Sequence, residues 1–341
     1  MSRLTWLGEN RFEFKPDNIA APSPGKGQVI VRVHSVGICG TDIHILQGHF
    51  PLARPPLVLG HEIAGEIVAV GAAVTKAKVG DHVTVDQVVG CGSCHFCQRG
   101  STQFCLSGYE LGITRDGGCQ TYLVLPESNV YPVPDVISFE EAAVLDMEVW
   151  AALSKPGIRS GDCVVVIGAG PAGLVAAQLA RVMGSYKVIL VARSPGRLQI
   201  AEQLGFADVV LSSQRHDFAE RIKAETRGFG ADLTIDCAGN EESAKLAIEC
   251  AIPGGRVVLF GVYPGPLPQF DVNSIVLRDL VIYGALSDRR GWEDVIALVA
   301  AGKLNLAPLI THRFPLSEAP GAYELAAAKA PGVVKVVLQI D

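Results

Sequence analysis

The sequence predicts an α/β protein in which a β-rich unit is joined to a second unit built on a doubly wound parallel sheet. Residues 25–130 contain short, apolar, β-branched runs separated by glycine and proline, which is typical of an all-β unit such as a partly open barrel. Residues 162–286 instead alternate strand-like and helix-like segments. The length of 341 residues is enough for two domains.

The β-rich part is justified by its strand-like runs. These runs, at 28–36, 62–70, 82–88 and 120–125, are short and apolar and end at glycine or proline. The pattern then changes, because residues 139–153 have helical spacing and no internal glycine or proline. The sequence therefore predicts a single helix that links the two units.

The second part has the regular alternation expected of crossover connections. Its predicted strands are 163–167, 187–192, 208–211, 232–236, 256–260 and 280–283, and helices are expected at 172–183, 196–204 and 242–251. The tail, residues 292–341, has a helix, a turn marked by proline and a final strand-like run at 333–340. Because the tail is too short to fold alone, we expect it to return to the first unit.

Composition and charge restrict the class of protein. A formal charge of −6, from 29 basic and 35 acidic residues with no basic block, argues against nucleic acid and against an anionic membrane as partners. The N-terminal residues lack the apolar core of a signal peptide. Nine cysteines without a secretion signal are typical of a reducing compartment, so we expect a cytoplasmic protein.

Four of these cysteines form a compact motif. Cys91, Cys94, Cys97 and Cys105 are separated by two, two and seven residues, which lets one short loop surround a tetrahedral ion. A disulfide pair would need an oxidising compartment. A ferredoxin-type cluster would need an earlier fourth cysteine followed by proline, whereas Leu106 follows Cys105. The motif predicts a structural zinc bound by four thiolates.

A glycine-rich turn follows the first strand of the second unit. Glycines there permit a tight turn and a close approach of the backbone to a ligand, and the N-terminus of the next helix faces the pyrophosphate of a dinucleotide. In this strand–turn–helix setting the motif predicts a dinucleotide site formed by Gly168, Gly170, Pro171, Ala172 and Gly173.

The end of the second strand indicates which dinucleotide is bound. An NAD site usually has an acidic residue about 20 positions after the glycines, to hold the ribose diol. Here the chain has Ala192 and Arg193, followed by Ser194 and Arg197. An arginine can pair with a 2′-phosphate that a carboxylate would repel. These residues favour NADP(H) over NAD(H), with solvated surface arginines as the alternative.

Two further motifs make the resemblance specific. These are Cys39-Gly40-Thr41-Asp42-Ile43-His44 and Gly60-His61-Glu62. With the four-cysteine motif and the glycine turn in the same order, the chain resembles the zinc-dependent medium-chain dehydrogenase/reductase superfamily over nearly its full length, and is closest in type to the sorbitol and polyol dehydrogenases. The resemblance implies a GroES-like catalytic domain, residues 1–151 and 287–341, and a Rossmann domain, residues 152–286.

The resemblance also implies a second, catalytic zinc, giving two Zn²⁺ per chain. Cys39 and His61 match two of its ligands, and Asp42 matches the carboxylate that orients the imidazole. Thr41 and His44 match the relay that carries the alcohol proton to water. The third ligand stays open: the family's position falls on Asp146, with Glu148 as a fallback, and Glu62 approaches the metal in polyol-type relatives.

The resemblance implies a hydride transfer between a secondary alcohol and a nicotinamide, with a polyol, sugar alcohol or cyclitol as the expected substrate. Sorbitol dehydrogenases carry a substrate-gripping arginine where this chain has Ser287, although Arg289 and Arg290 follow. An NAD-linked threonine-type dehydrogenase is one alternative, and a non-catalytic nucleotide-binding relative is another. Relatives pair their nucleotide-domain sheets edge to edge, which implies a homodimer or homotetramer.

Overall fold

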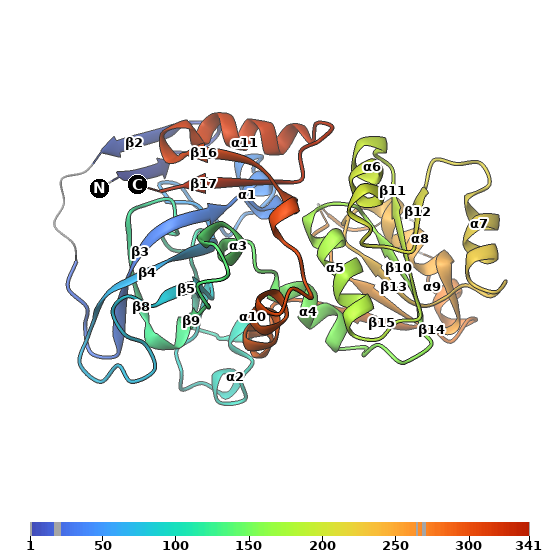
Figure 1. Cartoon of the computed structure of the whole chain (residues 1–341), viewed down its shortest axis with the longest axis horizontal. Helices are drawn as coiled ribbons and strands as arrows, with labels where there is room; N and C mark the ends of the chain where they lie inside the picture. Colours follow the sequence, from blue (N-terminus) through green and yellow to red (C-terminus); the bar gives the residue numbers. More distant parts are fainter. Residues whose placement is uncertain (1, 17–21, 264, 268–270, 341) are drawn as a thin grey trace. The chain divides into compact units, whose positions relative to one another are not determined.

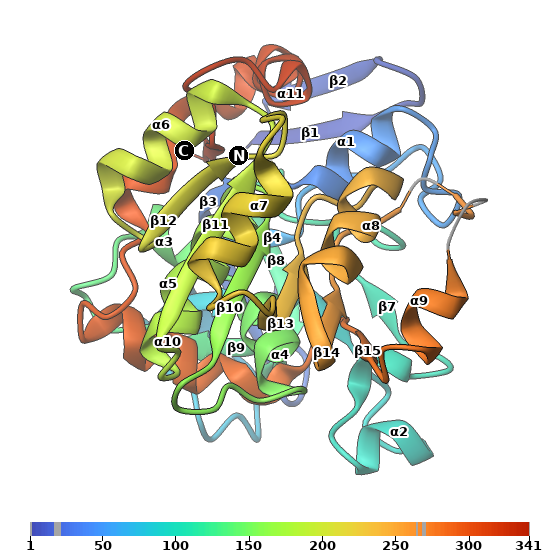
Figure 2. The same cartoon turned by 90° about the vertical axis from the view of Figure 1, so that its right-hand side faces the viewer.

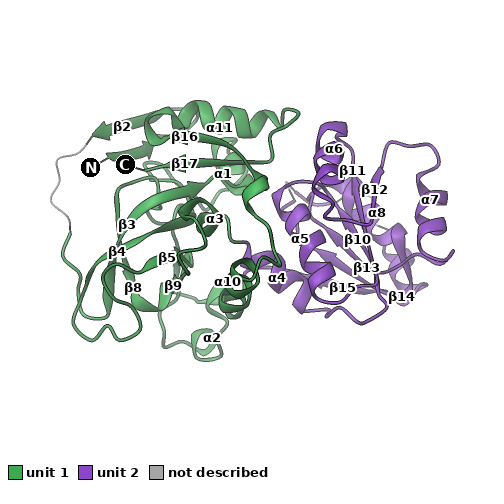
Figure 3. Cartoon of the chain, viewed as in Figure 1, with its two compact units in different colours: residues 1–145, 288–341 green, residues 146–287 purple. Residues whose placement is uncertain are grey.

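A computed structural model describes residues 2–16, 22–263, 265–267 and 271–340. The chain divides into two compact units, shown in Figure 1 and coloured separately in Figure 3. Unit 1 comprises residues 1–145 and 288–341, and unit 2 comprises residues 146–287. Each unit has its own buried hydrophobic cluster.

Unit 1 is organised around a seven-stranded sheet. Its central antiparallel pair is β3 (Gln28–Gly37) and β4 (Glu62–Val70). The order across the sheet is β16 (Ile310–Pro315), β17 (Lys335–Gln339), β3, β4, β5 (His82–Val85) and β9 (Val130–Pro132), with β8 (Tyr122–Pro126) also paired to β3. The last strand of the chain thus pairs with the first strand of the main sheet, which ties the tail to unit 1.

Smaller elements complete unit 1. Strands β1 (Ser2–Trp6) and β2 (Phe12–Pro16) form a separate hairpin. A short pair, β6 (Val88–Val89) and β7 (Tyr109–Glu110), lies at the base of the loop that holds the four cysteines. The C-terminal part contains α10 (Trp292–Ala300) and α11 (Ala319–Ala328), the latter between β16 and β17. The sequence did not predict β16 or α11.

The predicted single linking helix is wrong. The segment forms two helices, α3 (Phe139–Ala143) and α4 (Met147–Ser154). Asp146 stands between them as the N-cap of α4, where its Oδ1 accepts a hydrogen bond from the N–H of Val149 at 3.0 Å. Aspartate is among the strongest N-capping residues, so helical spacing alone could not reveal that a new helix begins here.

Unit 2 is a six-stranded sheet in which every neighbouring pair is parallel. The order across the sheet is β12 (Val209–Ser212), β11 (Lys187–Ala192), β10 (Cys163–Ile167), β13 (Ala231–Asp236), β14 (Ala251–Leu259) and β15 (Val281–Gly284). This is the order of a doubly wound dinucleotide-binding sheet, so that part of the fold prediction is confirmed.

Helices cover the unit 2 sheet in the expected alternation. Figure 2 shows α5 (Pro171–Val182) and α6 (Pro195–Leu204) beside β10, β11 and β12. Helix α8 (Glu241–Cys250) packs on β13 and β14. The chain reverses direction across the sheet at β10, which lies between β11 and β13. In open parallel sheets ligands bind outside the carboxyl ends of the strands at such a switch point.

Candidate active site

The register of the β3–β4 pair brings the first metal-ligand candidates together. Gly37 near the end of β3 lies opposite Glu62 at the start of β4. Cys39 comes two residues after Gly37, and His61 directly precedes Glu62. The thiol, imidazole and carboxylate are therefore delivered to one place by the backbone pairing of two adjacent strands.

Ligand atoms of Cys39, His61 and Glu62 lie within 4.8 Å of one another. Asp42 Oδ1 is 3.4 Å from Nδ1 of His61, which leaves Nε2 as the ring nitrogen for a metal. Asp42 also anchors the loop, since its Oδ2 accepts a hydrogen bond from the N–H of Cys39 at 2.9 Å. One thiolate, one imidazole and a carboxylate are a donor set that fits zinc.

The charge of His61 depends on these neighbours. Burial by itself lowers the pKa of His61, but the Asp42 carboxylate and Cys39 favour the charged form, and together they raise that pKa well above its ordinary value. These neighbours therefore favour a second proton on the His61 ring. To bind a metal the ring must give up that proton, because a metal-ligating histidine is a neutral imidazole.

Lys335 is a partner of this site that sequence reasoning missed. Its Nζ lies 2.6 Å from Oε1 and 2.5 Å from Oε2 of Glu62, and the lysine is almost fully buried in β17. Gly37 leaves room for the pair, because a side chain there would collide with the Glu62 carboxylate. The one signal available in the sequence was a lone charged residue inside the apolar final strand.

Both relay candidates, Thr41 and His44, lie on the same helix, α1 (Gly40–Leu46). Thr41 Oγ1 is 3.8 Å from Sγ of Cys39, so the hydroxyl is next to the metal-ligand cluster. His44 lies one turn further along and is half-buried. Burial lowers the pKa of His44, and the positive charges of Lys329 and His49 lower it further. A neutral His44 at pH 7 is suited to accept a proton.

The four-cysteine loop folds into a separate cluster. Ligand sulfurs of Cys91, Cys94, Cys97 and Cys105 all lie within 4.8 Å of one another, and the described cysteines form no disulfide. The N–H groups of Ser93 and Cys94 lower the pKa of the Cys91 thiol to about 5. A thiolate at neutral pH is the form that binds zinc. Four sulfurs fill a tetrahedron and leave no open position for a substrate.

The glycine turn has the close geometry that dinucleotide sites need. Gly168 has φ +107°, a left-handed value that favours glycine, and a side chain at Gly173 would collide with the carbonyl oxygen of Gly168. Gly170 is the N-cap of α5, and Pro171 and Ala172 begin the helix. The turn therefore aims the free N–H groups of an apolar helix at the carboxyl end of β10.

The basic residues after β11 occupy two different places. Ala192 ends the strand, and Arg193 is 69% exposed with its Nη1 3.5 Å from Oε2 of Glu242. Ser194 is the N-cap of α6. Arg197 is half-buried, and its Nη1 would lie 3.5 Å from a Cβ placed on Gly170. Arg197 is thus next to the glycine turn, whereas Arg193 projects from the strand end.

Other predicted residues are committed to local contacts. Asp146 and Glu148 both belong to unit 2, Asp146 as the cap of α4 and Glu148 in its first turn. Arg289 donates from Nε to the hydroxyl of Tyr131 at 3.2 Å, and Arg290 is paired with Asp288. Both arginines after Ser287 therefore have internal partners.

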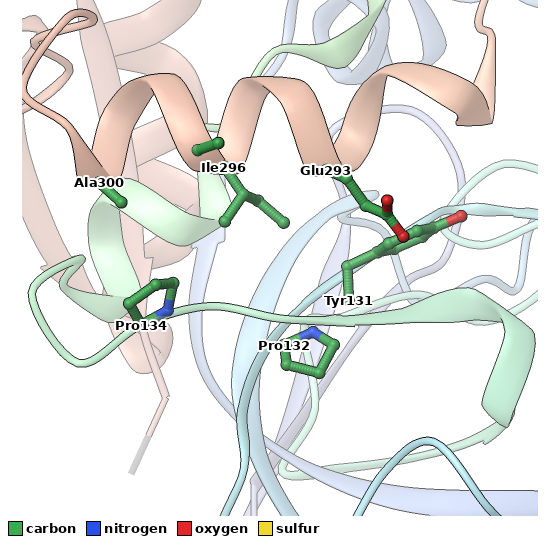
Figure 4. A pocket seen from close by; sticks show the side chains of 7 residues that line it. Tyr131, Pro132, Pro134, Glu293, Ile296 and Ala300 are labelled. Carbon is green, nitrogen blue, oxygen red and sulfur yellow. The ribbon is translucent and has the colours of Figure 1, made fainter.

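A hollow of about 380 Å³ lies elsewhere in unit 1, between β9 and α10 (Figure 4). Its walls come from two prolines, two alanines, one isoleucine, one tyrosine and one glutamate. They are Tyr131, Pro132, Pro134, Glu293, Ile296, Ala297 and Ala300. This hollow shares no residue with the metal-ligand cluster.

In the described part of the chain, the helices are all too short or too polar to cross a membrane.

Comparison with known proteins confirms the fold class predicted for each of the two units. Residues 25–135 match the family model described as "Alcohol dehydrogenase GroES-like domain", and residues 171–301 match the one described as "Zinc-binding dehydrogenase". The β-rich unit is therefore GroES-like, and the parallel sheet is of the Rossmann type.

Individual relatives agree with these matches. A sorbitol dehydrogenase of Halalkalibacterium halodurans is 34% identical over 322 residues, which cover 93% of each chain. An L-threonine 3-dehydrogenase of Pyrococcus abyssi is 35% identical over 331 residues, 94% of each chain. The solved alcohol dehydrogenase of Thermus sp. ATN1 covers 100% of both chains with a TM-score of 0.90 and 32% identity.

Proposed function

Because the chain belongs to the zinc-dependent medium-chain dehydrogenase/reductase superfamily, we propose that it transfers a hydride between a secondary alcohol and NADP(H), forming or reducing a ketone. The proposed substrate is a polyol, sugar alcohol or cyclitol. The observation that carries this proposal is the convergence of ligand atoms of Cys39, His61 and Glu62 within 4.8 Å. Residues 1–151 and 287–341 would hold metal and substrate, and residues 152–286 the cofactor.

The side chains of unit 1 have distinct tasks in this proposal. A zinc held by Cys39, His61 and an acidic residue would supply a Lewis acid that favours proton loss from an alcohol, and the nicotinamide would accept the hydride. Asp42 holds the imidazole of His61 in one tautomer. Thr41 and His44 would carry the released proton toward water.

The acidic ligand is proposed to be Asp146, with Glu62 as its competitor and Glu148 as the fallback. Glu62 already forms an ion pair with the ammonium of Lys335. Because this pair balances the charge of the carboxylate, it weakens the case for Glu62 as the metal ligand. We propose a second, structural zinc on Cys91, Cys94, Cys97 and Cys105. A protein that binds only that zinc would be the non-catalytic alternative.

The preference for NADP(H) rests on the strand end of β11. Ala192 offers no carboxylate to a ribose diol, and the exposed Arg193 forms a solvent-screened pair with Glu242 that a 2′-phosphate could replace. The place of Arg197 beside Gly170 supports a contact with the pyrophosphate in addition to the ribose phosphate. The aspartate variant Arg193→Asp should therefore raise KM for NADP more than tenfold and lower it for NAD.

The substrate class follows from the donors and the relatives. A carboxylate near the metal makes a harder, more polar site than three sulfur or nitrogen ligands do, which suits vicinal hydroxyls. The similarity to a sorbitol dehydrogenase supports a polyol, while the internal pairs of Arg289 and Arg290 argue against an arginine-gripped sorbitol. The similarity to an L-threonine 3-dehydrogenase supports threonine as a second candidate.

We propose a homodimer or homotetramer assembled through β15. This strand is one of the two edges of the unit 2 sheet and exposes Val281. The nearby helix α9 (Val272–Val276) exposes Val272 and Val276, and Leu277 follows it at 84% exposure. An apolar sheet edge is a template for pairing with another copy.

We also propose that the protein is located in the cytoplasm, because the thiol cluster needs a reducing compartment.

The test is a panel of polyols, sugar alcohols, cyclitols and L-threonine, each assayed with NAD and with NADP on zinc-replete protein. We expect the highest kcat/KM for a polyol-like substrate with NADP. Highest activity with threonine and NAD would replace the first candidate by the second. No activity with any alcohol, together with one zinc per chain, would identify a non-catalytic relative.

A further inference from the structure

Two loops of unit 2 meet at the carboxyl ends of neighbouring strands. One follows β13 at residues 236–240, and the other follows β14 at residues 260–263. The N–H groups of Phe260 and Gly261 donate to the carbonyl oxygen of Asp236, at 3.1 and 2.9 Å. Gly239 has φ +68°, and a Cβ there would lie 2.6 Å from the carbonyl oxygen of Val262. The loops therefore touch with no space between them.

Asp236 organises this contact from inside the protein. It is fully buried, and four groups donate hydrogen bonds to its carboxylate. Oδ1 accepts from the N–H of Ala238 at 2.8 Å and of Gly239 at 3.3 Å. Oδ2 accepts from the hydroxyl of Ser243 at 2.9 Å and of Tyr263 at 2.5 Å. Three donors come from the β13 side, and Tyr263 is the one that comes from the β14 loop.

The hydroxyl of Tyr263 is held in its protonated form, which can donate a hydrogen bond to Asp236. Burial raises its pKa, and the hydrogen bond to Asp236 raises it further. Hydrogen bonds to a buried carboxylate are stronger than those between neutral groups. The hydroxyl therefore keeps its proton near neutral pH and donates it to Asp236, which holds the β14 loop to the β13 loop.

The β13 loop also touches the glycine turn. The N–H of Cys237 donates to the carbonyl oxygen of Ile167 at 2.8 Å, and a Cβ on Gly168 would lie 3.2 Å from the nitrogen of Ala238. In a doubly wound sheet, the half that contains β10–β12 takes the adenosine part of a dinucleotide. The half that contains β13–β15 then faces the nicotinamide part, and its loops are the ones that Tyr263 joins.

We infer that Tyr263 is a positioning residue for the nicotinamide half of the cofactor, acting through Asp236 to hold the loops after β13 and β14 in their binding arrangement. This inference rests on the dinucleotide binding of the proposed function. It assigns a role to a hydrogen bond that none of the predicted cofactor residues shares.

The test compares two ligands that share the adenosine half. NADPH contains the nicotinamide, and 2′-phospho-ADP-ribose lacks it. Tyr263→Phe removes only the hydroxyl, so we expect the Kd of NADPH to rise about tenfold while that of 2′-phospho-ADP-ribose stays within about twofold. Tyr186→Phe is the matched control, because it removes one hydroxyl from a side chain of the same unit that is 63% exposed. It should leave both Kd values unchanged.

The inference is overturned if Tyr263→Phe binds NADPH as the unmodified protein does, or if it weakens both ligands equally. Hydrogen exchange on the unmodified protein gives a test that needs no variant. NADPH should protect residues 236–240 and 260–263 more than 2′-phospho-ADP-ribose does, and equal protection would also overturn it. An unmodified protein that binds neither NADPH nor NADH would instead refute the proposed function. If the unmodified protein binds NADH more tightly than NADPH, the same test uses NADH and ADP-ribose in place of NADPH and 2′-phospho-ADP-ribose.

Discussion

The ammonium of Lys335 lies 2.6 Å from Oε1 of Glu62, although the two residues are 273 positions apart in the chain. Lys335 begins the last strand, β17, and Glu62 begins β4, directly after His61. The ammonium of Lys335 is buried, and a buried charge is costly without a partner of opposite sign. The C-terminal strand thus supplies the counter-charge for one of the candidate metal ligands.

Replacing Lys335 by methionine should therefore alter the metal site. Without the ammonium, the Glu62 carboxylate has the metal as its remaining cationic partner, so we expect it to bind the metal and close a position that substrate needs. We predict a fall in kcat of about tenfold or more and a changed visible spectrum of the Co²⁺-substituted protein. Lys335→Arg keeps the charge and should keep the spectrum. An unaltered spectrum and kcat in Lys335→Met would contradict this role.

The two cysteine sets should separate by metal content and stability. Cys97→Ser should lose one zinc per chain and lower the unfolding temperature, because metal binding to a structural site contributes several kcal/mol to folding. Cys39→Ser should also lose one zinc, but with loss of activity and a nearly unchanged unfolding temperature. Cys163→Ala, a buried cysteine outside both clusters, is the control and should retain both ions. Elemental analysis and calorimetry measure the two effects.

Two substitutions at Asp146 distinguish its capping role from a metal role. Asparagine caps helices as well as aspartate does, whereas alanine does not and should cost roughly 1 kcal/mol of stability. If the carboxylate also serves the metal, Asp146→Asn should keep the stability of the protein and lower kcat. Equal kcat in Asp146→Asn and the unmodified protein would remove Asp146 from the metal site and leave its cap as its function.

The stability of unit 1 should depend on pH through Asp86. Burial raises the pKa of Asp86 from 3.8 to about 6, although the N–H of Val88 and the charge of Arg289 act in the opposite direction. Because the folded protein binds this proton more tightly than the unfolded chain, the Asp86 contribution to stability is present below about pH 4 and is lost as pH rises through about 6. The loss is at most about 3 kcal/mol.

Asp86→Asn should lack this loss, so its free energy of unfolding should fall less between pH 4 and pH 7 than that of the unmodified protein. Asp294→Asn, an exposed position at the start of α10, is the control and should keep the original pH dependence. Denaturant unfolding at a series of pH values measures both. Identical slopes in all three proteins would show that Asp86 is not the titrating group.

Local patterns predicted a large part of the fold because the information lay within a few residues. The alternation of strands and helices from residue 162 onward predicted the parallel sheet, and the glycine turn was identified where β10 meets α5. The cysteine motif is equally local, since its four sulfurs belong to one loop. Helical spacing failed at residues 139–153 because the capping bond of Asp146, not the apolar pattern, decides where α4 begins.

The sequence by itself determined the fold class and the family, and it predicts which groups bind a metal or a dinucleotide, because each depends on side-chain chemistry and on spacing along a short segment. Only the tertiary structure decided which distant groups become partners. Sheet register placed Lys335 beside Glu62, and the packing of two strand ends placed the Tyr263 hydroxyl on Asp236. Such pairs depend on how strands align in space, which the spacing of residues along the chain does not encode.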